Sequence, residues 1–330
     1  MTVQGISPVS LDELQEPVRA RLARVDAEMR RMIEDDFPLI TDVNRHLLRM
    51  RGKMLRPTLV LLADEAAGEP SPQAETLAAV IELIHLATLV HDDSVDHSTL
   101  RRGMPTINAL FSHQVSVIMG DFLYSRAVVE LVRFGSLDIL EVLARVTNEM
   151  TIGEMRQLLA HDPLAFTEDQ YDLLIRAKTA SLLSGACEVG GLNAPAPQRA
   201  ALARFGERLG MAFQIIDDLL DYTALSEDTG KPSGLDLREH KVTLPLIHAL
   251  PRMSQEERKL VSDLMADPEP DDASIAAVVA ATGRHGGLDY ARERAYKLIA
   301  EADDELQALP QSPAREWLRA SLGYIVERRR

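Results

Sequence analysis

Two aspartate-rich stretches with the same spacing are the part of this sequence best able to do chemistry. They are Asp92-Asp93-Ser-Val-Asp96 and Asp217-Asp218-Leu-Leu-Asp221. Each follows an apolar stretch, so we expect each to lie at the end of a buried helix. Residues four apart share a helix face, which puts the first and last aspartate of a motif on one side. Carboxylates crowded beside an apolar region repel one another unless a cation neutralises them.

One such motif could equally be a charged helix end in water, but its recurrence 125 residues further on favours a functional role. Mg²⁺ prefers a few carboxylates together with substrate phosphate oxygens. If the two helices face each other, all six carboxylates line one cavity. The sequence therefore predicts a site in which Mg²⁺ ions hold a diphosphate.

Cations and polar residues near the motifs are candidates for the rest of the site. Arg101 and Arg102 follow the first motif and could hold phosphates. His85 precedes Asp92 by seven residues on the same helical stripe, where a buried structural histidine is the alternative interpretation. Others are weak signals one by one: Lys53 and Arg56 at a predicted helix start, and Lys178, Thr179 and Gln214 on predicted helices.

Composition and charge narrow the class of protein. The 330 residues are 46% hydrophobic and only 4% aromatic, which favours a helical globular protein. A formal charge of −15 argues against binding to nucleic acid or to anionic lipid. Cys187 is the single cysteine and is expected to pack in the core of a cytoplasmic protein. We expect neither a signal peptide nor a stretch able to span a membrane.

Helical periodicity runs through most of the chain, and no stretch alternates strictly enough to predict a strand. A capping box at Ser10 and Glu13 should start the first helix. The predicted long helices are 10–36, 54–68, the segment leading into Asp92, 106–134, 137–160, 167–190 and 197–222. Thr223 to His240 carries Gly230, Pro232 and Gly234 and should form a loop or lid. With no clear linker, we expect one all-α domain over residues 1–330 and a solvated arginine tail, 328–330.

These residues together resemble the trans-isoprenyl diphosphate synthases, and the likeness covers nearly the whole chain. Gly52-Lys53-Met54-Leu55-Arg56-Pro57 is similar to the GKxxRP element of that family, with Met54 where a further arginine is common. The first aspartate region, with His85 and Arg101-Arg102-Gly103, and Gly120-Asp121-Phe122-Leu123 after it also match. In the second half the matching positions are Lys178-Thr179, Gln214, the second aspartate motif, Gly230-Lys231 and Lys241.

The resemblance implies a role for each position. Asp92, Asp96 and Asp217 would ligate Mg²⁺, with Asp93, Asp218 and Asp221 in direct or supporting roles. Lys178, Lys231 and Arg101 would hold an allylic diphosphate, while Lys53, Arg56, His85 and Arg102 would hold isopentenyl diphosphate. The catalytic group would also include Thr179, Gln214 and Lys241. The alternatives are a terpene cyclase, whose second motif normally mixes Asn, Ser or Thr with Glu, and a non-catalytic subunit, which usually lacks aspartates.

Product length and assembly are the last expectations. A chain growing from a diphosphate at Asp92 must pass Thr88 and Ala87, where short-chain members often carry aromatic rings. The small side chains predict an open passage and a long all-trans product, of the length used for quinone side chains. Farnesyl or geranylgeranyl diphosphate would be the product instead if Phe122, Leu123 or Phe134 closed the passage. The family and the apolar helix 106–134 predict a homodimer.

Overall fold

The structure is a computed structural model, and it describes residues 7–50, 52–158, 163–223 and 234–326. Helices dominate this part of the chain, as predicted. In order, the α-helices are α1 (Leu11–Gln15), α2 (Arg19–Ile33), α3 (Pro38–Arg49), α4 (Leu55–Ala66), α5 (Ala74–Val95), α6 (Ile107–Leu110), α7 (His113–Phe134), α8 (Leu137–Leu158), α9 (Glu168–Ile175), α10 (Ser181–Gly190), α11 (Ala196–Thr223), α13 (Leu235–Arg238), α14 (Leu244–Ala249), α15 (Gln255–Ala266), α16 (Asp272–Arg284), α17 (Gly287–Glu305) and α18 (Pro313–Val326). Short 3₁₀ turns lie at 16–18, 163–165, 250–252 and 306–308.

Several predicted helix bounds were wrong for identifiable reasons. The capping box at Ser10 is confirmed, with the Glu13 amide donating to Ser10 Oγ at 3.2 Å. Pro17 then turns the chain into a 3₁₀ segment, so α1 and α2 are separate helices and not one long one. The predicted helix 106–134 is interrupted at Phe111 and Ser112, and Ser112 caps α7 by accepting from the Val115 amide.

A small β-hairpin was not predicted. Strand β1 (Leu100–Arg101) pairs antiparallel with β2 (Met104–Pro105) directly after the first aspartate motif. Arg102 and Gly103 form its turn, and both have positive φ angles, 52° and 75°. Strands of two residues are too short for alternation to be seen in the sequence, but this hairpin turns the two arginines back beside α5.

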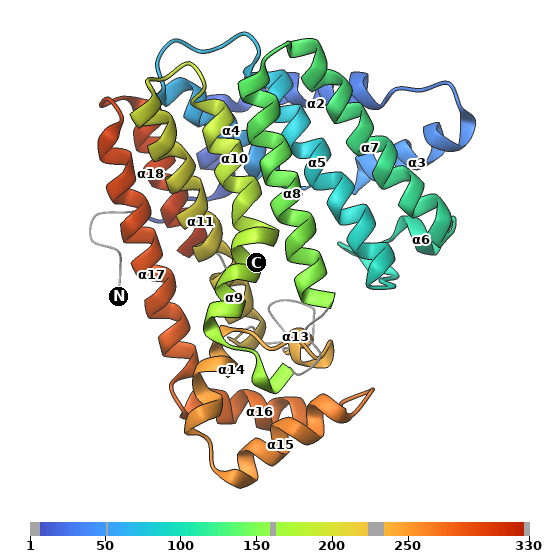
Figure 1. Cartoon of the computed structure of the whole chain (residues 1–330), viewed down its shortest axis with the longest axis vertical. Helices are drawn as coiled ribbons and strands as arrows, with labels where there is room; N and C mark the ends of the chain where they lie inside the picture. The colour runs from blue at the N-terminus through green and yellow to red at the C-terminus, as the bar shows by residue number, and fades with distance from the viewer. Residues whose placement is uncertain (1–6, 51, 159–162, 224–233, 327–330) are drawn as a thin grey trace.

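The long helices pack side by side as a bundle around α10 (Figure 1). Every residue of α10 except Glu188 is buried, since α10 is enclosed by α4, α5, α8 and α11. Close helix approach depends on glycine here: a Cβ at Gly206 of α11 would lie 2.4 Å from the Leu183 carbonyl oxygen of α10. A second hydrophobic cluster joins α13 to α16 at the lower end of the bundle in Figure 1.

Helix α5 corrects one expectation from composition. It is long and apolar enough to cross a membrane, the one such helix in the described part of the chain. However, 67% of its most apolar window is buried, and it packs against α4, α7 and α10. The apolar residues of α5 therefore belong to the protein core. Cys187 is buried in the same core as predicted, and burial raises the pKa of its thiol to about 12.

Candidate active site

One large cavity of about 1040 Å³ lies beside the polar end of α5. Its walls come from the start of α4, from α5, the hairpin, α7, α8, the segment 178–179, α11 and Tyr324 of α18. The predicted site residues that line it are Lys53, Arg56, His85, Ala87, Thr88, Asp92, Arg101, Arg102, Lys178, Thr179, Gln214 and Asp217. Residues chosen from widely separated parts of the sequence are thus brought into one space.

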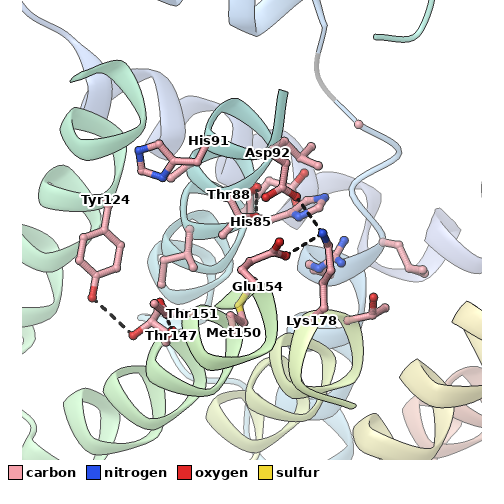
Figure 2. Close-up of a pocket in the computed structure, with 18 of the residues that line it drawn as sticks. His85, Thr88, His91, Asp92, Tyr124, Thr147, Met150, Thr151, Glu154 and Lys178 are labelled. Atoms are coloured by element: carbon pink, nitrogen blue, oxygen red, sulfur yellow. Dashed lines mark hydrogen bonds and ion pairs between the residues drawn. The ribbon is translucent and has the colours of Figure 1, made fainter. Parts of the chain in front are cut away.

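Asp92 lies on the acidic side of the cavity, and its neighbours there are Glu154 and Lys178 (Figure 2). Lys178 Nζ lies 3.8 Å from Asp92 Oδ2 and 2.7 Å from Glu154 Oε1. Burial, together with the charges of Glu154 and Asp96, raises the pKa of Asp92 to about 6 in spite of Lys178. Negative charge at this point is therefore only partly compensated by the protein.

The other two aspartates of the first motif have different surroundings. Asp93 is buried, and both of its carboxylate oxygens accept from Arg101 Nε, at 2.8 and 2.9 Å. Asp96 is exposed and occupies the C-cap position of α5. Neither residue is among those that line the cavity.

In the second motif, hydrogen bonds hold the side chains of Asp218 and Asp221. Asp218 is buried and accepts from the Tyr171 hydroxyl at 2.6 Å and from Gln214 Nε2 at 2.8 Å. Asp221 accepts from the backbone amides of Leu235 and Asp236, at 3.0 and 3.1 Å, at the start of α13. Of the six aspartates, only Asp92 and Asp217 are among the described residues lining the cavity, so the prediction that all six line it was wrong.

A basic group occupies another wall of the same cavity. Lys53, Arg56, His85 and Arg102 all line it, and Arg56 Nε is buried without a hydrogen-bond partner in the described part of the chain. Burial and the nearby guanidinium groups of Arg56 and Arg102 hold the pKa of His85 well below its usual range, so its ring is neutral.

Gly52 lies against the edge of this basic group. A Cβ at Gly52 would lie 3.0 Å from Arg102 Nη2, so a larger residue would press on the guanidinium. Arg102 is further fixed by donating from Nη1 to the Met50 carbonyl oxygen at 2.8 Å. The predicted GKxxRP element thus carries its lysine and arginine into the site, although Met54 adds no charge to it.

Lys178 and Thr179 lie on a π-helical turn, Arg176–Ala180, between α9 and α10. The sequence predicted one continuous helix over this region. Such turns widen a helix by one residue and often occur at functional sites. Here the turn places two successive side chains on the cavity wall, and Thr179 Oγ1 donates to Gln214 Oε1 at 2.9 Å.

The wall of the cavity beyond Asp92 combines small and polar side chains with the larger Met150 and Tyr124. Ala87 and Thr88 line it from α5, and Ala144, Thr147 and Thr151 line it from α8. Tyr124 of α7 lies across from α8, with its hydroxyl 3.4 Å from Thr147 Oγ1 (Figure 2).

The three bulky residues considered as possible stoppers are not among the residues lining this cavity. Phe122 packs under the Arg126 guanidinium, 4.9 Å from the ring centre, while Leu123 is buried in the core and Phe134 packs against it. They therefore form no part of the wall of this cavity.

Besides the aspartates described above, two predicted site residues lie away from the cavity or outside the described residues. Lys241 does not line it; its ammonium pairs with Glu239 at 2.6 Å. Lys231, Gly230 and most of the predicted lid fall within residues 224–233, outside the described part, as does the arginine tail.

Three site residues were missed by the sequence reasoning. Glu82, buried close to the charges of Arg56 and Arg102, has a pKa raised by its burial. Glu154 faces Lys178, and Tyr171 bonds to Asp218. A signal existed for Glu82, because it lies three residues before His85 on the same helix face. Nothing in the sequence distinguished Glu154 from a surface glutamate.

An all-α bundle with two aspartate-rich helix ends beside a basic cavity is the architecture of isoprenyl diphosphate synthases. A decaprenyl diphosphate synthase structure from Rhodobacter capsulatus superposes with a TM-score of 0.92 at 39% identity, covering 97% of this chain and 100% of that one. A polyprenyl synthase from Caulobacter crescentus, complexed with calcium and isoprenyl diphosphate, gives 0.91 at 34% identity, covering 98% and 99%.

The sequence agrees with the structure. The chain belongs to the polyprenyl synthetase family, which it matches over residues 37–282. It is 36% identical over 324 residues to the octaprenyl diphosphate synthase of Escherichia coli (strain K12), covering 98% of this chain and 100% of the relative. The predicted family and all-α fold are confirmed.

Proposed function

We propose that this chain is a trans-polyprenyl diphosphate synthase, which joins isopentenyl diphosphate to an allylic diphosphate. The observation that carries the proposal is a single cavity with two groups suited to two diphosphates. One group consists of Asp92, Asp217 and Lys178, and the other contains Lys53 and Arg56. A terpene cyclase, which takes one substrate, would have no use for the second group.

In the proposed reaction the carbon–oxygen bond of the allylic diphosphate breaks, and the double bond of isopentenyl diphosphate attacks the allylic carbon. Lys178, Arg101 and Lys231 hold the allylic diphosphate, and Lys53, Arg56, His85 and Arg102 hold the donor. The buried, unpartnered Arg56 Nε suits a phosphate oxygen. Thr179 and Gln214 face the allylic carbon, and Lys241 supports the acidic side. The proton lost in the addition leaves with the released diphosphate.

The acidic side chains of this cavity can supply some, but not all, of the ligands of a Mg²⁺ ion. No three acidic, histidine or cysteine side chains in the described segments form a group that could hold a metal ion without other ligands. Mg²⁺ commonly takes one or two carboxylates and completes its shell with substrate phosphate and water. The proposed ligands are Asp92 and Asp217, which line the cavity, and Asp96, which lies outside its wall at the C-cap of α5. Asp93, Asp218 and Asp221 support them through the bonds described above. Bound Mg²⁺ would stabilise the charge of the departing diphosphate.

A long all-trans product is the next part of the proposal. Ala87 is buried on the cavity wall, and Thr88 turns its hydroxyl back to the His85 carbonyl oxygen at 2.8 Å, leaving only its methyl group to face a chain. The octaprenyl and decaprenyl names of the two relatives described above support the same length class.

The proposal extends to the whole molecule. We infer one polyprenyl synthase domain over residues 1–330, acting in the cytoplasm as a homodimer. Exposed apolar side chains on α7 support the dimer, and the burial of Cys187 and α5 supports a soluble protein.

The test is incubation of the purified protein with isopentenyl diphosphate, an allylic diphosphate and Mg²⁺. We expect a polyprenyl diphosphate, and no reaction after chelation with EDTA. Asp92→Ala or Asp217→Ala should lower turnover by orders of magnitude while the helical circular dichroism persists. Near-normal turnover in either variant would refute the metal assignment. Release of a hydrocarbon from the allylic diphosphate alone would identify a cyclase instead.

A further inference from the structure

A chain of hydrogen bonds connects a buried tyrosine to the cavity wall. The Tyr171 hydroxyl donates to Asp218 Oδ2 at 2.6 Å, and Gln214 Nε2 donates to Asp218 Oδ1 at 2.8 Å. Gln214 Oε1 in turn accepts from Thr179 Oγ1 at 2.9 Å. Tyr171 is 2% exposed and Asp218 is 5% exposed, whereas Gln214 and Thr179 line the cavity. This network of hydrogen bonds therefore runs from the protein core to the cavity.

With Asp218 ionised, each hydrogen bond in this network has one direction. An ionised carboxylate only accepts hydrogen bonds, so both groups that face Asp218 must be donors. Gln214 therefore turns its amide nitrogen toward Asp218, and its carbonyl oxygen is left to face Thr179. Thr179 must then donate its single proton to Gln214. With its proton donated, the Thr179 hydroxyl can interact with a group in the cavity only through its oxygen lone pairs.

We infer that Tyr171 is a positioning residue: its bond to Asp218 fixes the Gln214 amide, which holds the Thr179 oxygen with its lone pairs toward the reacting allylic group. This inference rests on the proposed function. In that function positive charge develops on the allylic carbon, and a preorganised oxygen dipole beside it costs no reorganisation during the reaction. The π-helical turn contributes by placing Thr179 on the cavity wall.

A second buried tyrosine in the protein serves as a control for Tyr171. Tyr222 is also buried beside the second aspartate motif, but in the described part of the chain its hydroxyl bonds to no aspartate. Tyr171→Phe and Tyr222→Phe each remove one buried hydroxyl and keep the ring. Tyr222→Phe thus reports the effect of losing a buried ring hydroxyl that bonds to no aspartate, and the melting temperatures of the two variants separate a loss of stability from a loss of kcat.

The experiment is a double-mutant cycle on the full chain, with Tyr171→Phe, Thr179→Val and the double variant. For each, kcat, the KM of both substrates and the melting temperature are measured. We expect Tyr171→Phe to lower kcat about tenfold, the order of one hydrogen bond to a charged group, with the KM of isopentenyl diphosphate unchanged. The double variant should be no slower than Thr179→Val, because the two changes remove the same effect. Thr179→Ser, which keeps the hydroxyl, should restore the sensitivity to Tyr171→Phe.

Three results would overturn the inference: a wild-type kcat in Tyr171→Phe, an equal loss in Tyr222→Phe, or losses that multiply in the double variant. If Tyr171→Phe does not fold, Gln214→Met breaks the same chain at the cavity wall and replaces it in the cycle. An inactive wild-type chain refutes the proposed function and this inference together. An active wild type with multiplying losses refutes the inference alone.

Discussion

Asp92 and Asp93 are neighbours in the sequence, yet Asp92 faces the cavity and Asp93 bonds to Arg101. The charge on Asp92 is unfavourable without a bound cation, because burial first, and then Glu154 and Asp96, raise its pKa to about 6. Asp92→Asn should therefore stabilise the protein in EDTA at pH 8, by at most roughly 3 kcal/mol. Thermal melting measures the effect. Asp121→Asn is the control, since Asp121 lines the same cavity but is 72% exposed and should leave the melting temperature unchanged.

The same residue predicts how stability depends on pH. The pKa of Asp92 is higher in the folded state than its ordinary value of 3.8, so the folded state binds more protons between about pH 4 and 6. As the pH rises from about 4 to 6, the free energy of unfolding of the wild type should therefore decrease relative to that of Asp92→Asn. Urea titrations at pH 4, 5, 6 and 7 in EDTA measure it. Parallel curves for the two proteins would show that the Asp92 carboxyl is not destabilised by its surroundings.

The sequence could predict which residues meet at the site, but not the separate role of each of the six aspartates. Repeated spacing and apolar flanks were enough to select both motifs. Their separate roles come from groups distant in the sequence: Tyr171 lies 47 residues before Asp218, and the amides of Leu235 and Asp236 lie 14 and 15 residues after Asp221. Hydrogen-bond partners of this kind depend on tertiary packing, and hydrophobic periodicity does not encode them.

At the scale of elements, periodicity located the long helices and missed their irregularities. A π-helical turn keeps the helix going with one extra residue, so the apolar pattern of 167–190 looked continuous. The break between α6 and α7 and the short hairpin were missed because each involves only a few residues. The π-helical turn places Lys178 and Thr179 at the cavity, and the hairpin places Arg101 and Arg102 there. The backbone that is hardest to predict therefore lies at the site.

Helix α5 carries the prediction on product length. Ala87→Phe or Thr88→Phe should fill the passage and shorten the product while the first condensation continues, because Asp92 lies a turn further along the helix. Chromatography of the dephosphorylated products measures chain length. Thr88→Val is the control, since it keeps the volume and should keep the length. If the wild type stops at fifteen or twenty carbons, or if neither Phe variant shortens the product, the open-passage argument is wrong.

At the scale of the whole molecule, α6 and α7 leave an apolar surface in contact with water. Within the apolar segment 106–134 that predicted a dimer, Ile107 and Leu123 are buried, but Leu110, Phe111 and Ile118 are exposed. Val117, Val129 and Val132 on α7 extend the exposed set, and α7 lies on the outside of the bundle (Figure 1). Large groups of exposed apolar side chains are typical of protein interfaces. A net charge of −15 opposes non-specific association, so a specific apolar face is needed to bring two copies together.

The dimer prediction can be tested with a change of charge on this face. Ile118 and Val132 are each 65% exposed, so Ile118→Glu with Val132→Glu should leave the fold intact and abolish the dimer, because association would bury unpaired carboxylates. Light scattering at micromolar concentration should give the mass of two chains for the wild type and of one for the variant. Leu173→Glu on α9 is the control, because Leu173 is 45% exposed away from α7 and should leave the dimer unchanged. A monomeric wild type would contradict the prediction outright, and a dimeric double variant would place the interface elsewhere.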